Sequence, residues 1–101
     1  MTIICIHQEQ SRQAMLTSSG KPAKDQHVIT YDDGSTAFES YGTIIAHRPV
    51  NYPSQPIRLD KWKWNYSVTT ARYRNRFLGE ATADTRKRIK TGQYVLVDLN
   101  V

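Results

Sequence analysis

The sequence contains little cysteine and no long apolar run, and both absences narrow the class of protein. Its single cysteine, Cys5, cannot form a disulfide within the chain, which favours a reducing compartment. The longest apolar stretch, Ile3 to Ile6, is far too short to cross a bilayer as a helix. The N-terminus also lacks the basic and then apolar pattern of a secretory signal. We therefore expect a cytoplasmic protein that does not enter a membrane.

Motifs for catalysis and for metal binding are missing as well. The sequence contains no glycine-rich phosphate loop, no nucleophile elbow and no HExxH pattern. Asp32 and Asp33 precede Gly34, which is typical of a tight turn rather than of an acid–base pair. The three histidines and Cys5 do not have the spacing of a zinc site. The sequence thus predicts a protein that is not an enzyme and that needs no cofactor or metal.

The length and the charge describe a small basic domain. With 101 residues, the chain is expected to form a single domain over residues 1–101. Its net charge of +5 makes anionic partners plausible. The charge is uneven, because residues 58–90 contain ten basic and three acidic side chains, whereas the remainder contains four and six. The basic excess therefore belongs to one stretch of the chain, where the alternative is an ordinary solvated face.

The N-terminal half is predicted to be mainly β. Thr2 to His7 is apolar and β-branched, as in a central strand. Gln8 to Leu16 is polar and is expected to form a loop or a short helix, with further loop chemistry up to Gln26. The sequence Asp32-Asp33-Gly34 is typical of a hairpin turn. Three strands of one meander are expected over His27–Tyr31, Ser35–Ser40 and Thr43–His47.

The C-terminal half is predicted to contain two consecutive helices and a final strand. Arg48 to Pro56 holds three prolines and is expected to be a loop. The helices are expected over Ser67–Leu78, with Ser67 as N-cap, and over Thr82–Thr91, with Thr82 as N-cap. Short strands are expected over Ile57–Leu59 and Gln93–Leu99. The expected class is α+β, an antiparallel sheet with both helices on one face.

Helical spacing divides the two helices into an apolar and a basic side. Tyr73 and Phe77 share one side and are expected to pack on the sheet. The cations are expected to form a shared outer surface, with Arg74 nearer the apolar edge. The candidate binding residues are Arg72, Arg74, Arg76, Arg86, Lys87, Arg88 and Lys90, joined by Lys61 and Lys63. Such a surface suits phosphate groups.

The segment Lys61-Trp62-Lys63-Trp64-Asn65-Tyr66 alternates cations with aromatic rings. Exposed rings beside lysines can stack on unpaired bases. The same alternation fits a strand that enters the helix, with Trp62 and Trp64 packed together in the core. We favour the core interpretation, because large aromatic side chains are mostly buried.

Roughly residues 35–100 contain an ordered set of short motifs, namely Tyr-Ser-x-Thr-Thr, Phe-Leu-Gly-Glu, Thr-Arg-Lys-x-Ile and Gly-x-Tyr. In this set the chain resembles a small uncharacterised domain of bacteriophage and mobile-element proteins. The resemblance implies a phage accessory protein in the host bacterial cytoplasm and carries no activity to transfer. The first of these motifs is expected at a helix entry, the second at the exit of that helix and the third in the next helix.

Two functions of different class follow from these features. The first is a phage accessory protein that binds nucleic acid through the basic helical face. The alternative is a protein-binding inhibitor or modulator of a host factor, such as a defence or transcription component, with Tyr41, Tyr52 and Trp62 as anchors. A homodimer formed through an apolar edge strand is also compatible with the pattern.

Overall fold

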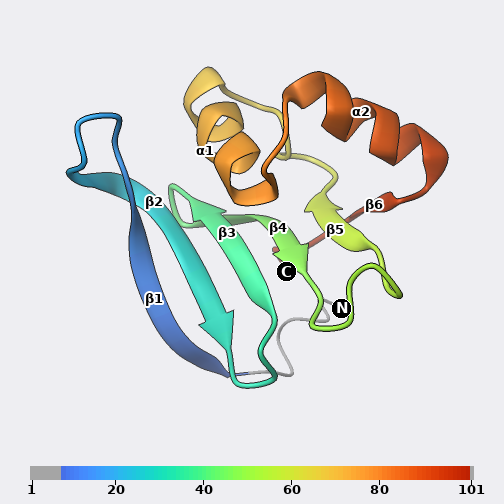
Figure 1. The fold of residues 1–101 in the computed structure, drawn as a ribbon, viewed down its shortest axis with the longest axis horizontal. Coiled ribbons are helices and arrows are strands. Elements are labelled where there is room, and N and C mark those ends of the chain that lie inside the picture. The colour runs from blue at the N-terminus through green and yellow to red at the C-terminus, as the bar shows by residue number, and fades with distance from the viewer. Residues whose placement is uncertain (1–7, 101) are drawn as a thin grey trace.

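The computed structural model of the chain describes residues 8–100, which form a mixed β-sheet and two helices (Figure 1). The strands are β1 (Glu9–Leu16), β2 (Pro22–Tyr31), β3 (Thr36–Ser40), β4 (Thr43–Arg48), β5 (Ile57–Asp60) and β6 (Tyr94–Val97), and the helices are α1 (Val68–Leu78) and α2 (Thr82–Thr91). The six strands lie side by side in chain order. The first four neighbouring pairs are antiparallel, and β5 pairs with β6 in parallel because both helices form the crossover between them. The expected α+β class is confirmed.

The predicted meander is present and is shaped by its turns. β2 and β3 pair with Val28 opposite Phe38, as the hairpin signal indicated. In the turn, the Asp33 carboxylate accepts the Ser35 N–H at 2.8 Å, and Gly34 has a φ of 90°. β3 and β4 are joined by the two residues Tyr41 and Gly42, both at positive φ, which is the geometry of a tight hairpin turn.

The expectation for Gln8 to Leu16 is wrong, because this segment is the edge strand β1. Its side chains are mostly exposed, so the sequence shows little of the alternation that identifies a half-buried strand. Pairing with β2, which begins at Pro22 rather than at His27, decides its conformation. Arg12 of β1 also forms an ion pair with Glu39 of β3. The strand predicted over residues 2–7 lies outside the described residues.

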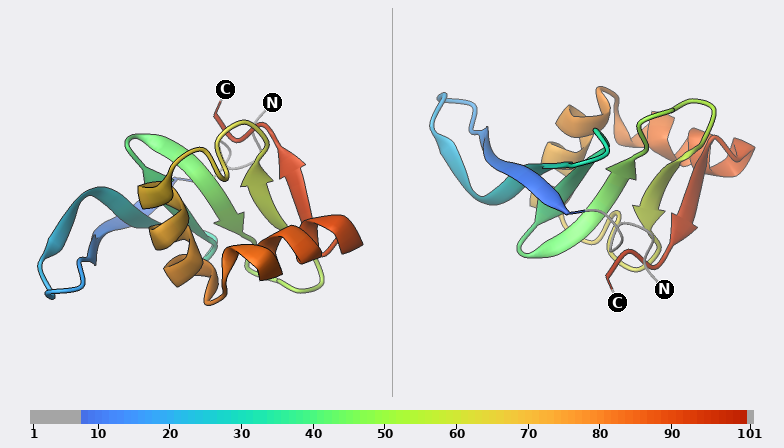
Figure 2. Two further views of the ribbon diagram at one scale, coloured as in Figure 1. Left: turned by 90° about the horizontal axis from the view of Figure 1, so that it is seen from above. Right: turned by 90° about the horizontal axis from the view of Figure 1, so that it is seen from below.

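Both helices lie on the same face of the sheet and cover its main core. Figure 2 shows them in front of the strands from above and behind the strands from below. α1 lies over β3, where the rings of Phe38 and Phe77 stack at 6.1 Å and the hydroxyls of Ser40 and Thr70 are 2.9 Å apart. Tyr73 is buried in the same core, as predicted from the helical spacing.

The helix ends follow local capping chemistry, with one correction. The Ser67 hydroxyl caps α1 by accepting the Thr70 N–H at 3.1 Å, as expected. Thr82 is not the N-cap of α2, because that position is taken by Ala81. The Asp84 carboxylate accepts the Ala81 N–H at 3.2 Å. The Thr82 hydroxyl is thereby left to accept a hydrogen bond from α1.

A cluster around Glu80 ties the helices to the last strand. The hydroxyl of Tyr94 in β6 donates to the Glu80 carboxylate at 2.8 Å, and Arg88 of α2 donates to the same oxygen at 2.9 Å. Thr85 donates to the second carboxylate oxygen at 2.6 Å. Burial, and then the hydrogen bond to Glu80, raise the pKa of Tyr94 well above its ordinary value.

This cluster predicts a loss of stability at high pH. Because the folded pKa of Tyr94 is raised, its contribution is complete below the unfolded pKa of about 10 and is lost as the pH rises above it. In urea unfolding, the free energy of unfolding of the wild type should therefore decline with pH above that value. Tyr94→Phe should make this decline shallower by up to about 1.4 kcal/mol per pH unit. Tyr41→Phe, at an exposed ring, should keep the wild-type slope. Equal slopes for Tyr94→Phe and wild type would contradict the assignment.

Candidate functional site

The segment of alternating lysines and aromatics is a turn that links β5 to α1, and not a strand. Asp60, the buried last residue of β5, organises this turn through hydrogen bonds to its backbone. Its carboxylate accepts the N–H groups of Trp62 at 3.2 Å and Lys63 at 2.9 Å, and its carbonyl accepts the Trp64 N–H at 3.0 Å. The prediction that both tryptophans are buried together is wrong. Trp62 is 69% exposed, whereas Trp64 is half-buried against the core.

Arg74 of α1 holds the same turn through hydrogen bonds. Its side chain is fully buried, at 0% exposure. One guanidinium nitrogen donates to the Trp64 carbonyl at 2.6 Å and to the Asn65 side chain at 3.0 Å. The other donates to the Asn75 side chain at 2.9 Å and to the Thr82 hydroxyl at 2.8 Å. A single side chain thus joins the turn, α1 and the start of α2. Its predicted role at the outer surface is wrong for this reason.

The acceptors around Arg74 are all neutral oxygens, so its charge is stabilised without an ion pair. Burial, and then the nearby Arg86, lower the pKa of Arg74. An arginine still keeps its proton at neutral pH. The guanidinium carbon of Arg74 lies 5.1 Å from the centre of the Trp64 ring, and that of Arg86 lies 5.6 Å from it. Both distances are in the range of a cation–π contact.

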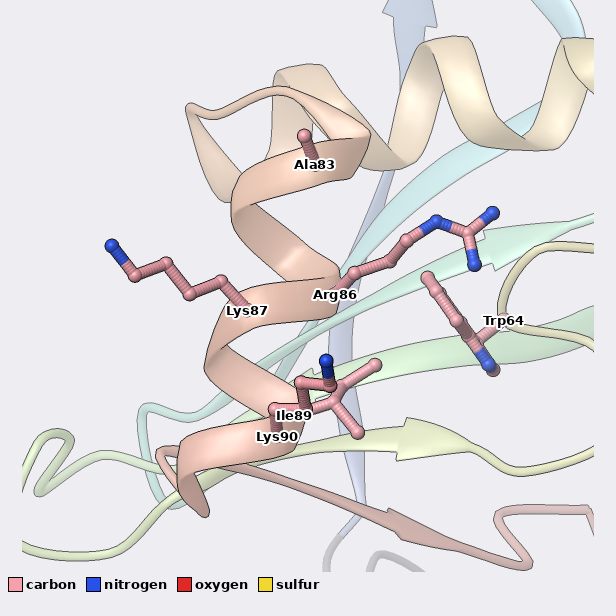
Figure 3. A pocket seen from close by; sticks show the side chains of 6 residues that line it. All are labelled: Trp64, Ala83, Arg86, Lys87, Ile89 and Lys90. Atoms are coloured by element: carbon pink, nitrogen blue, oxygen red, sulfur yellow. The ribbon is translucent and has the colours of Figure 1, made fainter.

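A hollow of about 510 Å³ lies between the turn and α2. Its lining consists of Trp64, Ala83, Arg86, Lys87, Ile89 and Lys90. Figure 3 shows Arg86 reaching toward the Trp64 ring, while Lys87 extends from the other side of α2. Among the described residues, the lining contains three cations and no carboxylate. The hollow therefore offers a flat aromatic ring in a positive surrounding.

A second hollow of about 490 Å³ lies on the other side of the turn, against α1. Its lining consists of Asn65, Tyr66, Ser67, Val68, Ala71, Arg72 and Asn75, again without a carboxylate among the described residues. Trp64 borders the first hollow and its neighbour Asn65 borders the second. The two hollows thus border neighbouring residues of the turn.

The structure separates the nine predicted binding residues into two groups. Six are exposed and form no ion pair within residues 8–100, namely Lys61, Lys63, Arg72, Arg86, Lys87 and Lys90. Arg88 is paired with Glu80, and Arg74 is buried. Arg76 is exposed, but it donates to the Leu16 carbonyl and lies over the Tyr73 ring. The basic surface therefore contains fewer cations than predicted, and these come from the turn, α1 and α2.

Two residues shape this site: sequence reasoning missed Asp60 and gave Arg74 the wrong role. Asp60 follows an apolar strand and precedes the aromatic segment, where aspartate is common at the start of a turn. That signal was available from the sequence. Arg74 has no comparable signal, because its type and spacing are also those of the exposed arginines on the same helix.

Neither a metal centre nor a membrane helix is found in residues 8–100. These residues contain no group of three histidine, cysteine, aspartate or glutamate side chains placed to hold a metal ion. Neither α1 nor α2 is long and apolar enough to cross a membrane. The two hollows beside the turn are the candidate site.

Loss of Arg74 is expected to destabilise the protein and loosen the turn. Arg74→Met keeps part of the apolar stem but removes the donors to four oxygens, and we expect it to lower the free energy of unfolding by about 2 kcal/mol. Urea unfolding followed by tryptophan fluorescence measures this. Arg72→Met, two residues earlier on the exposed side of α1, should change it by less than about 0.5 kcal/mol. Equal stability of the two variants would show that Arg74 does not hold the turn.

Comparison with known proteins gives one family and no function. The model of a family of unknown function, DUF8033, matches residues 11–93. This range includes the turn and both helices, and it begins well before the residues on which the phage-domain resemblance was based. No curated protein and no solved structure matches the chain.

Proposed function

The chain belongs to the DUF8033 family, and we propose that it is a non-enzymatic protein that binds nucleic acid through the turn and the outer side of α2. One observation carries the proposal. The Trp64 ring lies in a hollow lined by Arg86, Lys87 and Lys90, and no carboxylate of the described chain lines it. A flat ring and several cations together complement the two chemical parts of a nucleotide, the planar base and the phosphate.

The exposed side of α2 supports this proposal by its spacing. Arg86 and Lys87 lie three and four positions after Ala83, and Lys90 lies three positions after Lys87. All three cations are exposed. Arg86 and Lys90, four positions apart, form a positive row along α2, while Lys87 extends from the other side of the helix. Lys61 and Lys63 of the turn are exposed as well. Phosphates bound along such a row release counterions, which supplies much of the affinity and makes it depend on salt.

A salt titration tests the proposal. Labelled single- and double-stranded probes should bind at low salt in fluorescence anisotropy, and affinity should fall steeply as salt increases. If all six exposed cations contact phosphates, the slope of log K against log salt should be about −4 on a single strand. If no probe is bound at low salt, the proposed function is wrong.

A pair of double variants separates this surface from general basicity. Lys87→Ala with Lys90→Ala should weaken binding by about tenfold and reduce the salt slope on a single strand by about 0.7 for each cation removed. Lys21→Ala with Lys24→Ala removes the same charge from the β1–β2 hairpin, away from α2 (Figure 1). This control should bind as the wild type does. Equal losses in both variants would mean that net charge, and not this surface, determines binding.

The second candidate is a protein partner, and the exposed side chains Trp62 and Val68 favour it. Exposed aromatics often anchor protein interfaces, and the surrounding cations would suit an acidic partner such as a host factor. The phage origin suggested by the resemblance is part of the same proposal and gives the host bacterial cytoplasm as its setting. Recovery of one stoichiometric protein from lysate after nuclease treatment, by a chain that binds no probe, would favour this candidate.

A further inference from the structure

The turn exposes two aromatic rings that pack only partly against the protein. Trp62 is 69% exposed and Tyr66 is 43% exposed. Single exposed aliphatic side chains are common on protein surfaces, but large aromatic rings are usually buried to a greater extent. Two such rings within one short turn indicate a surface whose apolar area is available to a ligand.

The backbone that carries these rings is fixed before any ligand binds. Asp60 accepts two N–H groups of the turn through its carboxylate, and Arg74 donates to the Trp64 carbonyl and to the Asn65 side chain. Asp60 and Arg74 are both buried, at 1% and 0% exposure. The conformational entropy of the turn is therefore lost when the protein folds, and its loss does not weaken the binding of a ligand.

Each ring of the turn has a cation beside it. The ammonium of Lys61 lies 4.9 Å from the centre of the Trp62 ring, and that of Lys63 lies 4.8 Å from the centre of the Tyr66 ring. Arg86 takes the corresponding place beside Trp64. Three flat rings thus lie within five residues of chain, and each has a positive charge beside it. A polymer that repeats a flat group and a negative charge is complementary to this pattern.

We infer that the turn binds single-stranded nucleic acid, with unpaired bases stacked on Trp62 and Tyr66 and phosphates held by Lys61, Lys63 and Arg86. This inference rests on the proposed function and narrows it to strands with accessible bases. In a duplex the base faces are stacked on one another, and only the base edges are open in the grooves. Exposed aromatic rings of a protein therefore cannot stack on the bases of a duplex. A single strand offers the faces, and stacking on them does not depend on sequence.

The test measures affinity for four probes of one sequence. Single-stranded DNA and single-stranded RNA of about 15 nucleotides, each also annealed to its complement, are titrated with the full chain by fluorescence anisotropy. At least one of the single strands should bind about tenfold or more tightly than its duplex. The two single-stranded arms also show which polymer is preferred, because they carry the same phosphates and differ only in the sugar and in thymine replacing uracil.

Three variants test the role of the exposed ring. Trp62→Ala should weaken binding of the single strand by about tenfold, and Trp62→Phe by about threefold or less, because phenylalanine keeps a stacking face. Tyr41→Ala removes another exposed ring, in the β3–β4 turn, and should bind as the wild type does. Binding of the single strand should also quench tryptophan fluorescence, and Trp62→Phe should reduce this quenching.

The outcomes separate the inference from the proposed function. Duplexes bound as tightly as single strands, or a Trp62→Ala variant with wild-type affinity for the single strand, would overturn the inference and leave binding to nucleic acid intact. Absence of binding to all four probes at low salt would overturn both. A single-strand preference that disappears with Trp62→Ala and not with Tyr41→Ala would support the inference.

Discussion

The arrangement of the candidate site depends on one buried guanidinium. Arg74 is fully enclosed, and its hydrogen bonds reach the turn, the next residue of α1 and the first residue of α2. Burying a charge is costly unless it is well hydrogen-bonded, and here four neutral oxygens accept from it. The planar, forked shape of the group allows this, whereas a lysine could not reach so many acceptors in fixed directions. The helices and the turn are thus held in one geometry by a polar contact beside the apolar core.

This use of Arg74 changes the electrostatics of the surface. A cation that is committed to internal hydrogen bonds cannot meet a ligand, and Arg88 is committed in the same way to Glu80. Of the predicted binding residues, those that are exposed and make no internal hydrogen bond or ion pair among the described residues lie on the turn, on α2 and at Arg72 of α1. Because the buried charge lies just beneath Trp64, it adds to the positive potential at the ring without occupying the hollow.

Local chemistry made much of the fold predictable, and packing explains the failures. The Asp-Gly turn, the Ser67 cap and the proline-containing loop before β5 are decided by a few adjacent residues, and all are present. β1 was not predictable, because an exposed edge strand has little apolar alternation and depends on β2 for its hydrogen bonds. The N-cap of α2 is one residue earlier than predicted, and the Thr82 hydroxyl accepts a hydrogen bond from Arg74 instead of capping the helix. In each failure a contact distant in sequence replaced the local preference.

For the site, the sequence by itself determined which chemical groups are available: a basic stretch that alternates with aromatic rings and is followed by two capped helices. It did not determine which of these groups meet water. Arg72 and Arg74 are two residues apart on one helix, and Trp62 and Trp64 are two apart in one turn, yet Arg72 and Trp62 are exposed, whereas Arg74 is buried and Trp64 is half-buried. The residue types are identical within each pair, so composition and local pattern cannot distinguish them. Only the positions of α1, α2 and the turn against the sheet decide, because burial is a property of surrounding atoms that the chain brings together from distant residues.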